Sequence, residues 1–94
     1  MKTSLDDIFI NSLPSLDLHG ETRDSARVLV KDFINDNYFL KNEKIVIIHG
    51  IGKGILKDEV YSILKRDKRV EQYHINPYNI GCTLVYIKKR LKLN

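Results

Sequence analysis

The stretch KIVIIHGIGKG, residues 44–54, decides the fold of this 94-residue chain. Four consecutive aliphatic residues, Ile45 to Ile48, stand between Lys44 and a segment with three glycines. A run of mostly β-branched residues that ends at a glycine is typical of a strand whose two faces are both buried. The stretch therefore predicts a buried strand over residues 44–50, followed by a sharp turn.

Segments with the pattern of helices lie on both sides of this strand. Upstream, Thr22 is a suitable N-cap, and apolar residues at helical spacing continue to about residues 40–42. Downstream, apolar residues at the same spacing mark a second amphipathic helix from Leu56 to Leu64. Its acidic residues lie near the start and its basic residues near the end, which suits the helix dipole.

Three further segments are predicted to be strands. SLDLHG (15–20) alternates apolar and polar residues and stops at a glycine, and VEQYHIN (70–76) also alternates. CTLVYIKK (82–89) follows after the turn-rich NPYNIG (76–81). The order of elements is therefore βαβαββ.

This order predicts the architecture. A strand, a helix and a following strand form a right-handed crossover with a parallel strand pair, whereas a short connection makes the last pair antiparallel. We therefore predict an α/β fold, a two-layer sandwich in which a four-stranded mixed sheet carries two helices on one face.

The composition fits one soluble domain. The hydrophobic share of 43% and the charged share of 30% are ordinary for a globular protein. The one cysteine, Cys82, is predicted to be a buried apolar residue. The N-terminus lacks the apolar core of a signal peptide and no run is long enough to span a membrane, so a cytoplasmic location without membrane contact is predicted.

The chain divides into three parts. Residues 1–13 form a weakly patterned extension, in which Leu5, Ile8 and Phe9 could form one amphipathic turn against the body. Residues 14–90 form the domain, and residues 91–94 a basic tail.

The net charge of +4 is compatible with a polyanionic partner. The basic residues gather after the second helix and near the C-terminus: Lys57, Lys65, Arg66, Lys68, Arg69, Lys88, Lys89, Arg90 and Lys92. A nucleic-acid-facing patch and a set of solvated helix ends are equally compatible with this distribution.

Candidate catalytic residues lie at the ends of the first two strands. Asp17 and His19 are two residues apart and share one face of the first strand, and His49 ends the second strand. Ligands of open α/β sheets bind beyond the carboxyl ends of parallel strands, which lie about 4.8 Å apart. We therefore expect Asp17, His19 and His49 to meet at one edge, although each of them taken singly is more often structural.

The glycine segment is not a nucleotide fingerprint. GIGKG is too short for the P-loop pattern, and Ile55 stands where the third glycine of a dinucleotide-binding motif belongs. A tight turn before a helix still lets backbone N–H groups approach a phosphate. The predicted phosphate-binding residues are Gly50, Gly52, Lys53, Gly54 and Lys57. No close histidine or cysteine pair supports a metal site.

Three motifs together resemble the small MutS-related (Smr) domain. LDLHG (16–20), HGIGKG (49–54) and GCTLVYI (81–87) resemble it in order and spacing, over about residues 14–90. The resemblance implies the fold of the C-terminal domain of bacterial translation initiation factor three, which is also a βαβαββ sandwich.

The resemblance also implies site residues. The aspartate and histidine of the first family motif fall on Asp17 and His19. The second motif falls on His49 and the glycines that follow it. Family members often carry more glycines before the last strand, where this chain has residues 76–79, and this departure bears on substrate preference.

The family is associated with endonuclease activity on DNA or on RNA, including ribosome-bound messenger RNA. We therefore predict an endonuclease, with RNA favoured over DNA. One histidine would deprotonate the ribose 2′-OH and another protonate the leaving oxygen, with Asp17 orienting His19. No cofactor is expected for RNA, whereas cleavage of DNA would need an activated water and could use a divalent metal at Asp17.

Two other functions are compatible with the sequence. One is a non-catalytic module that binds nucleic acid or the ribosome, with Tyr73 and Tyr78 as stacking surfaces. The other is a structural or protein-interaction domain, for which no positive feature is found. The oligomeric state and the assignment of acid and base are left open.

Overall fold

Strand β2 (Lys44–Ile48) lies inside the sheet, as its apolar run predicts. The computed structural model describes residues 12–90. The other elements in chain order are β1 (Ser15–Asp17), α2 (Arg23–Phe39), α3 (Ile55–Arg66), β3 (Val70–Asn76) and β4 (Asn79–Ile87). The predicted βαβαββ order is confirmed.

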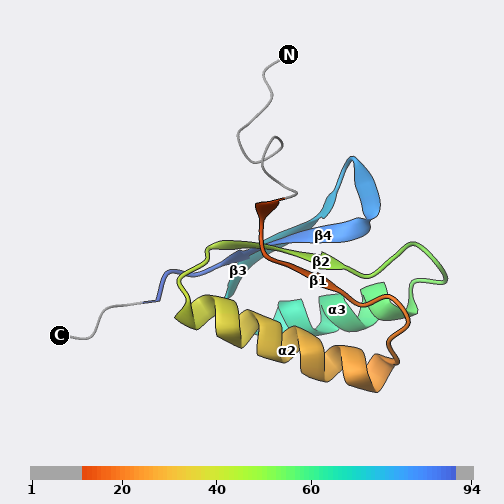
Figure 1. Ribbon diagram of the computed structural model, residues 1–94, viewed down its shortest axis with the longest axis horizontal. Coiled ribbons are helices and arrows are strands. Elements are labelled where there is room, and N and C mark those ends of the chain that lie inside the picture. The colour runs from red at the N-terminus through yellow and green to blue at the C-terminus, as the bar shows by residue number, and fades with distance from the viewer. Residues whose placement is uncertain (1–11, 91–94) are drawn as a thin grey trace, which may run out of the picture.

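The sheet has the strand order β1-β2-β4-β3. β1 and β2 are parallel, while β4 is antiparallel to both β2 and β3. Both helices cover the same face of the sheet, with their N-termini toward the same edge (Figure 1). The predicted two-layer sandwich with a mixed sheet is confirmed.

The main core lies between the sheet and the helices. Ile45 and Ile47 of β2 point into it with no exposed surface, together with Val30 of α2 and Val60 of α3. Burial of one such side chain stabilises the fold by about 1.5–3 kcal/mol. Residues on the opposite face of the sheet, among them Val46 and Cys82, form a second, smaller cluster. Both faces of β2 are therefore buried, and so is Cys82, as predicted.

Local signals fix the helix starts. Thr22 is the N-cap of α2, and it forms a capping box with Ser25. Gly54 is the N-cap of α3 in a left-handed conformation with φ 80°. Because a left-handed residue favours glycine, this glycine is a backbone requirement at the start of α3.

Several strand boundaries differ from the sequence prediction. β2 ends at Ile48 and not at residue 50, and β4 ends at Ile87 and not at residue 89. β4 begins at Asn79 and not at Cys82, because Asn76 and Asn79 pair across a two-residue turn. Their side-chain oxygens accept hydrogen bonds from the N–H groups of Tyr78 and Gly81, at 2.9 and 3.0 Å. β1 ends at Asp17 and does not reach residue 20.

The predicted turn at Leu5, Ile8 and Phe9 and the tail at 91–94 lie outside the described residues. Within residues 12–90, no helix has the length and apolar character needed to cross a membrane.

Candidate active site

The two candidate motifs come together at one edge of the sheet. Asp17 is paired with Ile48 in the parallel register, and the Leu18 N–H donates to the Ile48 carbonyl at 2.9 Å. His19 and His49 therefore follow neighbouring strands at the same edge, from which both helices begin (Figure 1).

The side chains at this edge lie on different faces. Asp17 stands beside Ile48, on the face away from the helices, and His49 is the first residue after β2. Successive side chains of a strand point to opposite faces, so His49 lies on the helix face. The three residues therefore reach one edge of the sheet, as expected, but Asp17 and His49 lie on different faces of it.

Asp17 shapes the turn that carries His19. Its Oδ1 accepts a hydrogen bond from the His19 backbone N–H at 2.9 Å, and the Glu21 N–H donates to the Leu18 carbonyl at 3.0 Å. Gly20 has φ 79°, as the third position of a type II turn requires. Asp17 thus holds the backbone of His19 and not its ring, and the His19 side chain is exposed.

Asp17 also affects the Cys82 thiol, on the face of the sheet away from the helices. Burial raises the pKa of the Cys82 thiol, and the negative charge of Asp17 raises it further. Cys82 is therefore an inert thiol next to the first motif.

His49 is buried and held from both sides. Only 6% of the residue is exposed. Its Nδ1 lies 2.9 Å from the Gly50 carbonyl, and its Nε2 lies 2.8 Å from the Thr83 hydroxyl. The Thr83 and Tyr61 hydroxyl oxygens are in turn 3.2 Å apart. A chain of polar groups therefore runs from β2 through β4 to α3.

The partners of His49 determine its tautomer. A carbonyl oxygen only accepts hydrogen bonds, so Nδ1 carries a proton. In the neutral ring, Nε2 then accepts the proton of the Thr83 hydroxyl. His49 therefore fixes the carbonyl of Gly50, the first residue of the glycine loop.

The glycine loop (residues 50–54) is attached to the β3–β4 hairpin. The Gly81 carbonyl accepts from the N–H groups of both His49 and Gly50 at 2.9 Å. A Cβ atom on Gly81 would lie 3.3 Å from the Gly50 Cα. Gly81 thus lies where two backbones approach closely, and a side chain there would need one of them to shift by a few tenths of an ångström.

A small pocket opens between the loop and the start of α3. Its volume is about 240 Å³, and its lining includes His49, Gly52, Lys53 and Gly54. Among the described residues no side chain caps the N-terminus of α3, so the N–H groups of its first turn are available to an anion. Three of the predicted phosphate-binding residues therefore line one cavity.

Lys57 adds a positive charge next to this pocket. Its Nζ lies 5.5 Å from the centre of the Tyr61 ring. Tyr61 belongs to the chain of polar groups that ends at His49, so Lys57, Tyr61 and His49 form one side of the site. Gly50 does not line the pocket but begins the loop above it.

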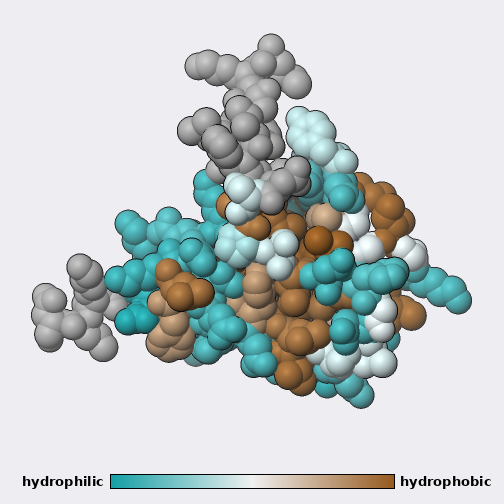
Figure 2. All heavy atoms as spheres, in the orientation of Figure 1, coloured by the Kyte–Doolittle hydropathy of each residue, from teal (hydrophilic) through white to brown (hydrophobic). Residues whose placement is uncertain are grey.

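Apolar side chains surround the site at the surface. Ile51 and Ile55 are exposed on the glycine loop and the first turn of α3, and Tyr78 and Ile80 are exposed on the hairpin. Apolar atoms reach the surface at this edge, whereas hydrophilic residues dominate toward the C-terminus (Figure 2). The site edge is therefore more apolar than the opposite end.

The model of the Smr domain family matches residues 16–88 of the chain. The chain belongs to the Smr domain family. The match includes both candidate motifs and all four strands except the first residue of β1.

Curated relatives carry the domain as part of a much longer protein. The chain is 33% identical over 66 residues to "Endonuclease MutS2" of Agathobacter rectalis, covering 70% of this chain and 8% of that protein. It is 35% identical over 68 residues to the protein of the same name from Caldanaerobacter subterraneus subsp. tengcongensis, covering 72% of this chain and 9% of that protein. The matched Smr domain thus spans less than a tenth of either relative.

Solved structures share the fold. The Smr domain of Thermus thermophilus MutS2 superposes with a TM-score of 0.78 at 29% identity, covering 81% of this chain and 99% of that one. YdaL, a stand-alone small MutS-related protein from Escherichia coli, has a TM-score of 0.77 at 22% identity, covering 94% of this chain and 80% of that one. The second likeness concerns the fold alone.

Sequence reasoning missed two residues of this Smr domain site, Thr83 and Tyr61. Thr83 has no exposed surface and joins His49 to Tyr61. The available signal was a threonine inside an otherwise apolar strand. A buried hydroxyl needs a partner, and His49 is a polar group at the end of the neighbouring strand.

Two aromatic predictions have different outcomes. Tyr73 packs against the core and lies 5.3 Å from the Tyr61 ring, so it is not a free stacking surface. Tyr78 is 74% exposed. His74 is exposed, and the centre of its ring lies 5.6 Å from that of the Tyr86 ring.

No group of three His, Cys, Asp or Glu side chains with the spacing of a metal site occurs among residues 12–90.

Proposed function

We propose that this Smr domain is an endonuclease that cleaves phosphodiester bonds of nucleic acid, with RNA favoured over DNA. The observation that carries the proposal is the parallel register of β1 and β2. This register places the exposed His19 at the same sheet edge as the glycine loop and the free N-terminus of α3. Relatives named as endonucleases contain the same domain, which supports the assignment for this chain.

The pocket at the start of α3 is the proposed phosphate site. The first-turn N–H groups of α3 and the loop amides around Gly52 and Gly54 would bind the phosphate oxygens. Lys53 and Lys57 would neutralise the charge that builds on these oxygens during cleavage. Gly50 would set the entry of the loop, because its carbonyl is held by His49.

His19 is the proposed proton-transfer residue. In RNA, the 2′-oxygen attacks the phosphorus while His19 takes the 2′-OH proton. The bond from phosphorus to the 5′-oxygen breaks, and this oxygen takes up a proton from solvent. The products are a 2′,3′-cyclic phosphate and a 5′-hydroxyl end, and His19 returns its proton to water.

His49 is a positioning residue in this proposal. Both of its ring nitrogens are engaged, and 6% of the residue is exposed, so its first role is to hold the glycine loop. This differs from the sequence hypothesis, in which both histidines exchange protons with the substrate. Asp17 likewise shapes the turn and acts on His19 through the backbone.

DNA has no 2′-OH, so its cleavage would need a water nucleophile. In that case the exposed Asp17 carboxylate is the candidate ligand for a divalent metal.

A second candidate function is a non-catalytic module that binds nucleic acid, with the ribosome as a candidate partner. The engagement of both His49 nitrogens favours it, because only one histidine is then left for chemistry. Its exposed Tyr78 would offer a stacking surface for a base. A ribosomal partner and a cytoplasmic location stay predictions of the sequence.

Incubation of the purified protein with labelled single-stranded RNA and duplex DNA, with and without EDTA, tests these functions. We expect RNA to be cut in EDTA with cyclic phosphate ends, and a 2′-O-methylated strand to be bound without being cut. Loss of cutting in His19→Ala would support the mechanism. RNA cleavage that persists after replacement of both His19 and His49 by Ala would contradict it, and binding without any turnover would favour the second function.

A further inference from the structure

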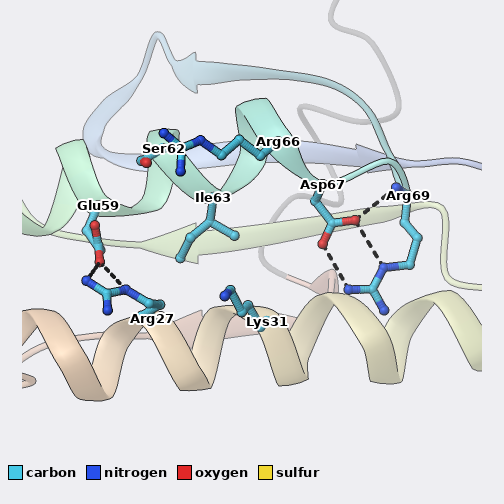
Figure 3. Close-up of a pocket in the computed structure, with 8 residues that line it drawn as sticks. All are labelled: Arg27, Lys31, Glu59, Ser62, Ile63, Arg66, Asp67 and Arg69. Carbon is cyan, nitrogen blue, oxygen red and sulfur yellow. Dashed lines mark hydrogen bonds and ion pairs between the residues drawn. The ribbon is translucent and has the colours of Figure 1, made fainter.

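A hollow of the described surface lies between the two helices, away from the candidate active site. Its volume is about 590 Å³. It is lined by Arg27, Lys31, Glu59, Ser62, Ile63, Arg66, Asp67 and Arg69, as Figure 3 shows. We refer to it as the interhelical groove.

The two carboxylates of the groove are already neutralised. Glu59 accepts from the Nε and an Nη of Arg27 at 2.7 and 2.6 Å. Asp67 accepts from the Nε and an Nη of Arg69 at 3.0 and 2.9 Å. These hydrogen bonds with Arg69 hold the pKa of the Asp67 carboxyl below its usual range. Each pair therefore closes one end of the groove with no net charge.

The middle of the groove keeps an unbalanced positive charge. Lys31 comes from α2, while Ser62 and Arg66 come from α3. The Arg66 side chain runs back along its helix toward Ser62, with Lys31 on the facing helix (Figure 3). Among residues 12–90 no carboxylate forms an ion pair with Arg66.

Arg66 and Ser62 lie on the same side of α3, because residues four apart on a helix are neighbours. The Arg66 side chain points toward the N-terminus of its helix, the usual direction for a long helical side chain, and so runs toward Ser62 (Figure 3). Lys31 lines the same hollow from α2. A guanidinium, a hydroxyl and an ammonium around one hollow form a donor set suited to a phosphate.

We infer that the interhelical groove is a second phosphate-binding site, which takes the backbone of a single-stranded nucleic acid at Lys31, Ser62 and Arg66. The inference rests on the proposed function, because nucleic acid is the ligand in both.

The groove is placed to extend the active site. Both helices begin at the edge that carries the candidate active site (Figure 1). Ser62 lies seven residues into α3, which is about 10 Å from the helix start at 1.5 Å per residue. A strand whose scissile phosphate lies at that start would therefore reach the groove within a few nucleotides.

The test compares two double variants that remove the same amount of charge. Lys31→Gln/Arg66→Gln removes both cations of the groove, and Lys65→Gln/Lys68→Gln removes two exposed lysines near the same helix end. Fluorescence anisotropy measures the binding of a 2′-O-methylated oligonucleotide of about a dozen residues, which cannot be cut through its 2′-oxygen, over a series of salt concentrations.

We expect Lys31→Gln/Arg66→Gln to bind about tenfold more weakly at low salt, with a salt slope smaller by about 0.7 for each phosphate that the protein no longer neutralises. The Lys65→Gln/Lys68→Gln control should bind close to wild type. Equal affinities and equal salt slopes for the two double variants would contradict the phosphate-binding role of the groove.

Failure of the groove and failure of the nuclease give different results. If the wild-type protein cuts RNA but binds the strand independently of Lys31 and Arg66, the phosphate-binding role of the groove is wrong, while the proposed nuclease activity is supported. If the wild-type protein cuts neither RNA nor DNA, yet binds the strand through Lys31 and Arg66, the proposed nuclease activity is wrong, while the phosphate-binding role of the groove is supported.

Discussion

The two histidines of the site edge follow neighbouring strands, and each precedes a glycine, but their surroundings are opposite. His19 lies in a turn outside the sheet and is exposed, with its backbone N–H bound to Asp17. His49 lies under the glycine loop, with one ring nitrogen at Gly50 and the other at Thr83. One ring is free to exchange protons with a ligand, and the other is a fixed part of the fold.

The difference teaches that two similar motifs can divide one function between them. The first motif presents a reactive group on a short turn. The second motif holds a loop in a left-handed glycine conformation and keeps the start of α3 open for an anion. Replacement of one residue at a time should therefore separate activity from stability.

The largest expected effect is on cleavage by His19→Ala. Loss of a general acid–base group lowers the rate by about 10²–10⁴-fold. The free energy of unfolding, measured in urea, should change by no more than about 0.5 kcal/mol, because the side chain is exposed. Unchanged RNA cleavage by a folded His19→Ala protein would remove His19 from the mechanism.

The reverse pattern is expected for His49→Ala. The change leaves a cavity and removes the partners of the Gly50 carbonyl and the Thr83 hydroxyl, so the free energy of unfolding should fall by about 2–4 kcal/mol. Urea unfolding measures this cost, and His19→Ala is the matched control. A His49→Ala protein as stable as wild type would show that the histidine does not hold the loop.

The role of Thr83 is tested by Thr83→Val, which keeps the shape and removes the hydroxyl. The buried Nε2 of His49 then has no partner, and we expect the free energy of unfolding to fall by about 1–3 kcal/mol. Thr83→Ser keeps the hydroxyl and should retain this hydrogen bond. If Thr83→Val had a higher free energy of unfolding than Thr83→Ser, the hydrogen bond would not be what stabilises the site.

A smaller loss of stability than for His49 or Thr83 is expected for Asp17→Ala, about 0.5–1.5 kcal/mol, because one exposed hydrogen bond to the His19 N–H is removed. Asp17→Asn keeps an oxygen that accepts this bond but has no charge. The free energy of unfolding in urea and the rate of RNA cleavage should therefore be close to wild type for Asp17→Asn and lower for Asp17→Ala. An Asn variant that keeps its stability but no longer cleaves would show that the charge of Asp17 acts on the substrate, the ring or a metal.

Much of the fold could be predicted from particular residues. The aliphatic run at Ile45–Ile48 sets the central strand, Thr22 sets the start of α2, and Gly54 precedes α3. The beginning of β4 could not be predicted, because the pairing of Asn76 with Asn79 depends on side chains that accept backbone N–H groups two residues on.

The site was predicted in part. The shared edge follows from topology, since parallel neighbours end together. The faces depend on register, and a shift of one residue moves a side chain to the other face of the sheet. Because Asp17 pairs with Ile48 and not with His49, the side chains of Asp17 and His49 lie on opposite faces of the sheet. The partners of His49 come from β4 and α3, which sequence spacing alone does not place.

The central claim is that His49 is a fixed, buried ring and His19 a free one. Nitrogen-15 NMR of the two imidazole side chains in the folded protein tests this most directly. The account predicts a slowly exchanging proton on His49 Nδ1, bound to the Gly50 carbonyl, and no protected ring proton on His19. Ring protons of His49 that exchange with water as fast as those of His19 would contradict it.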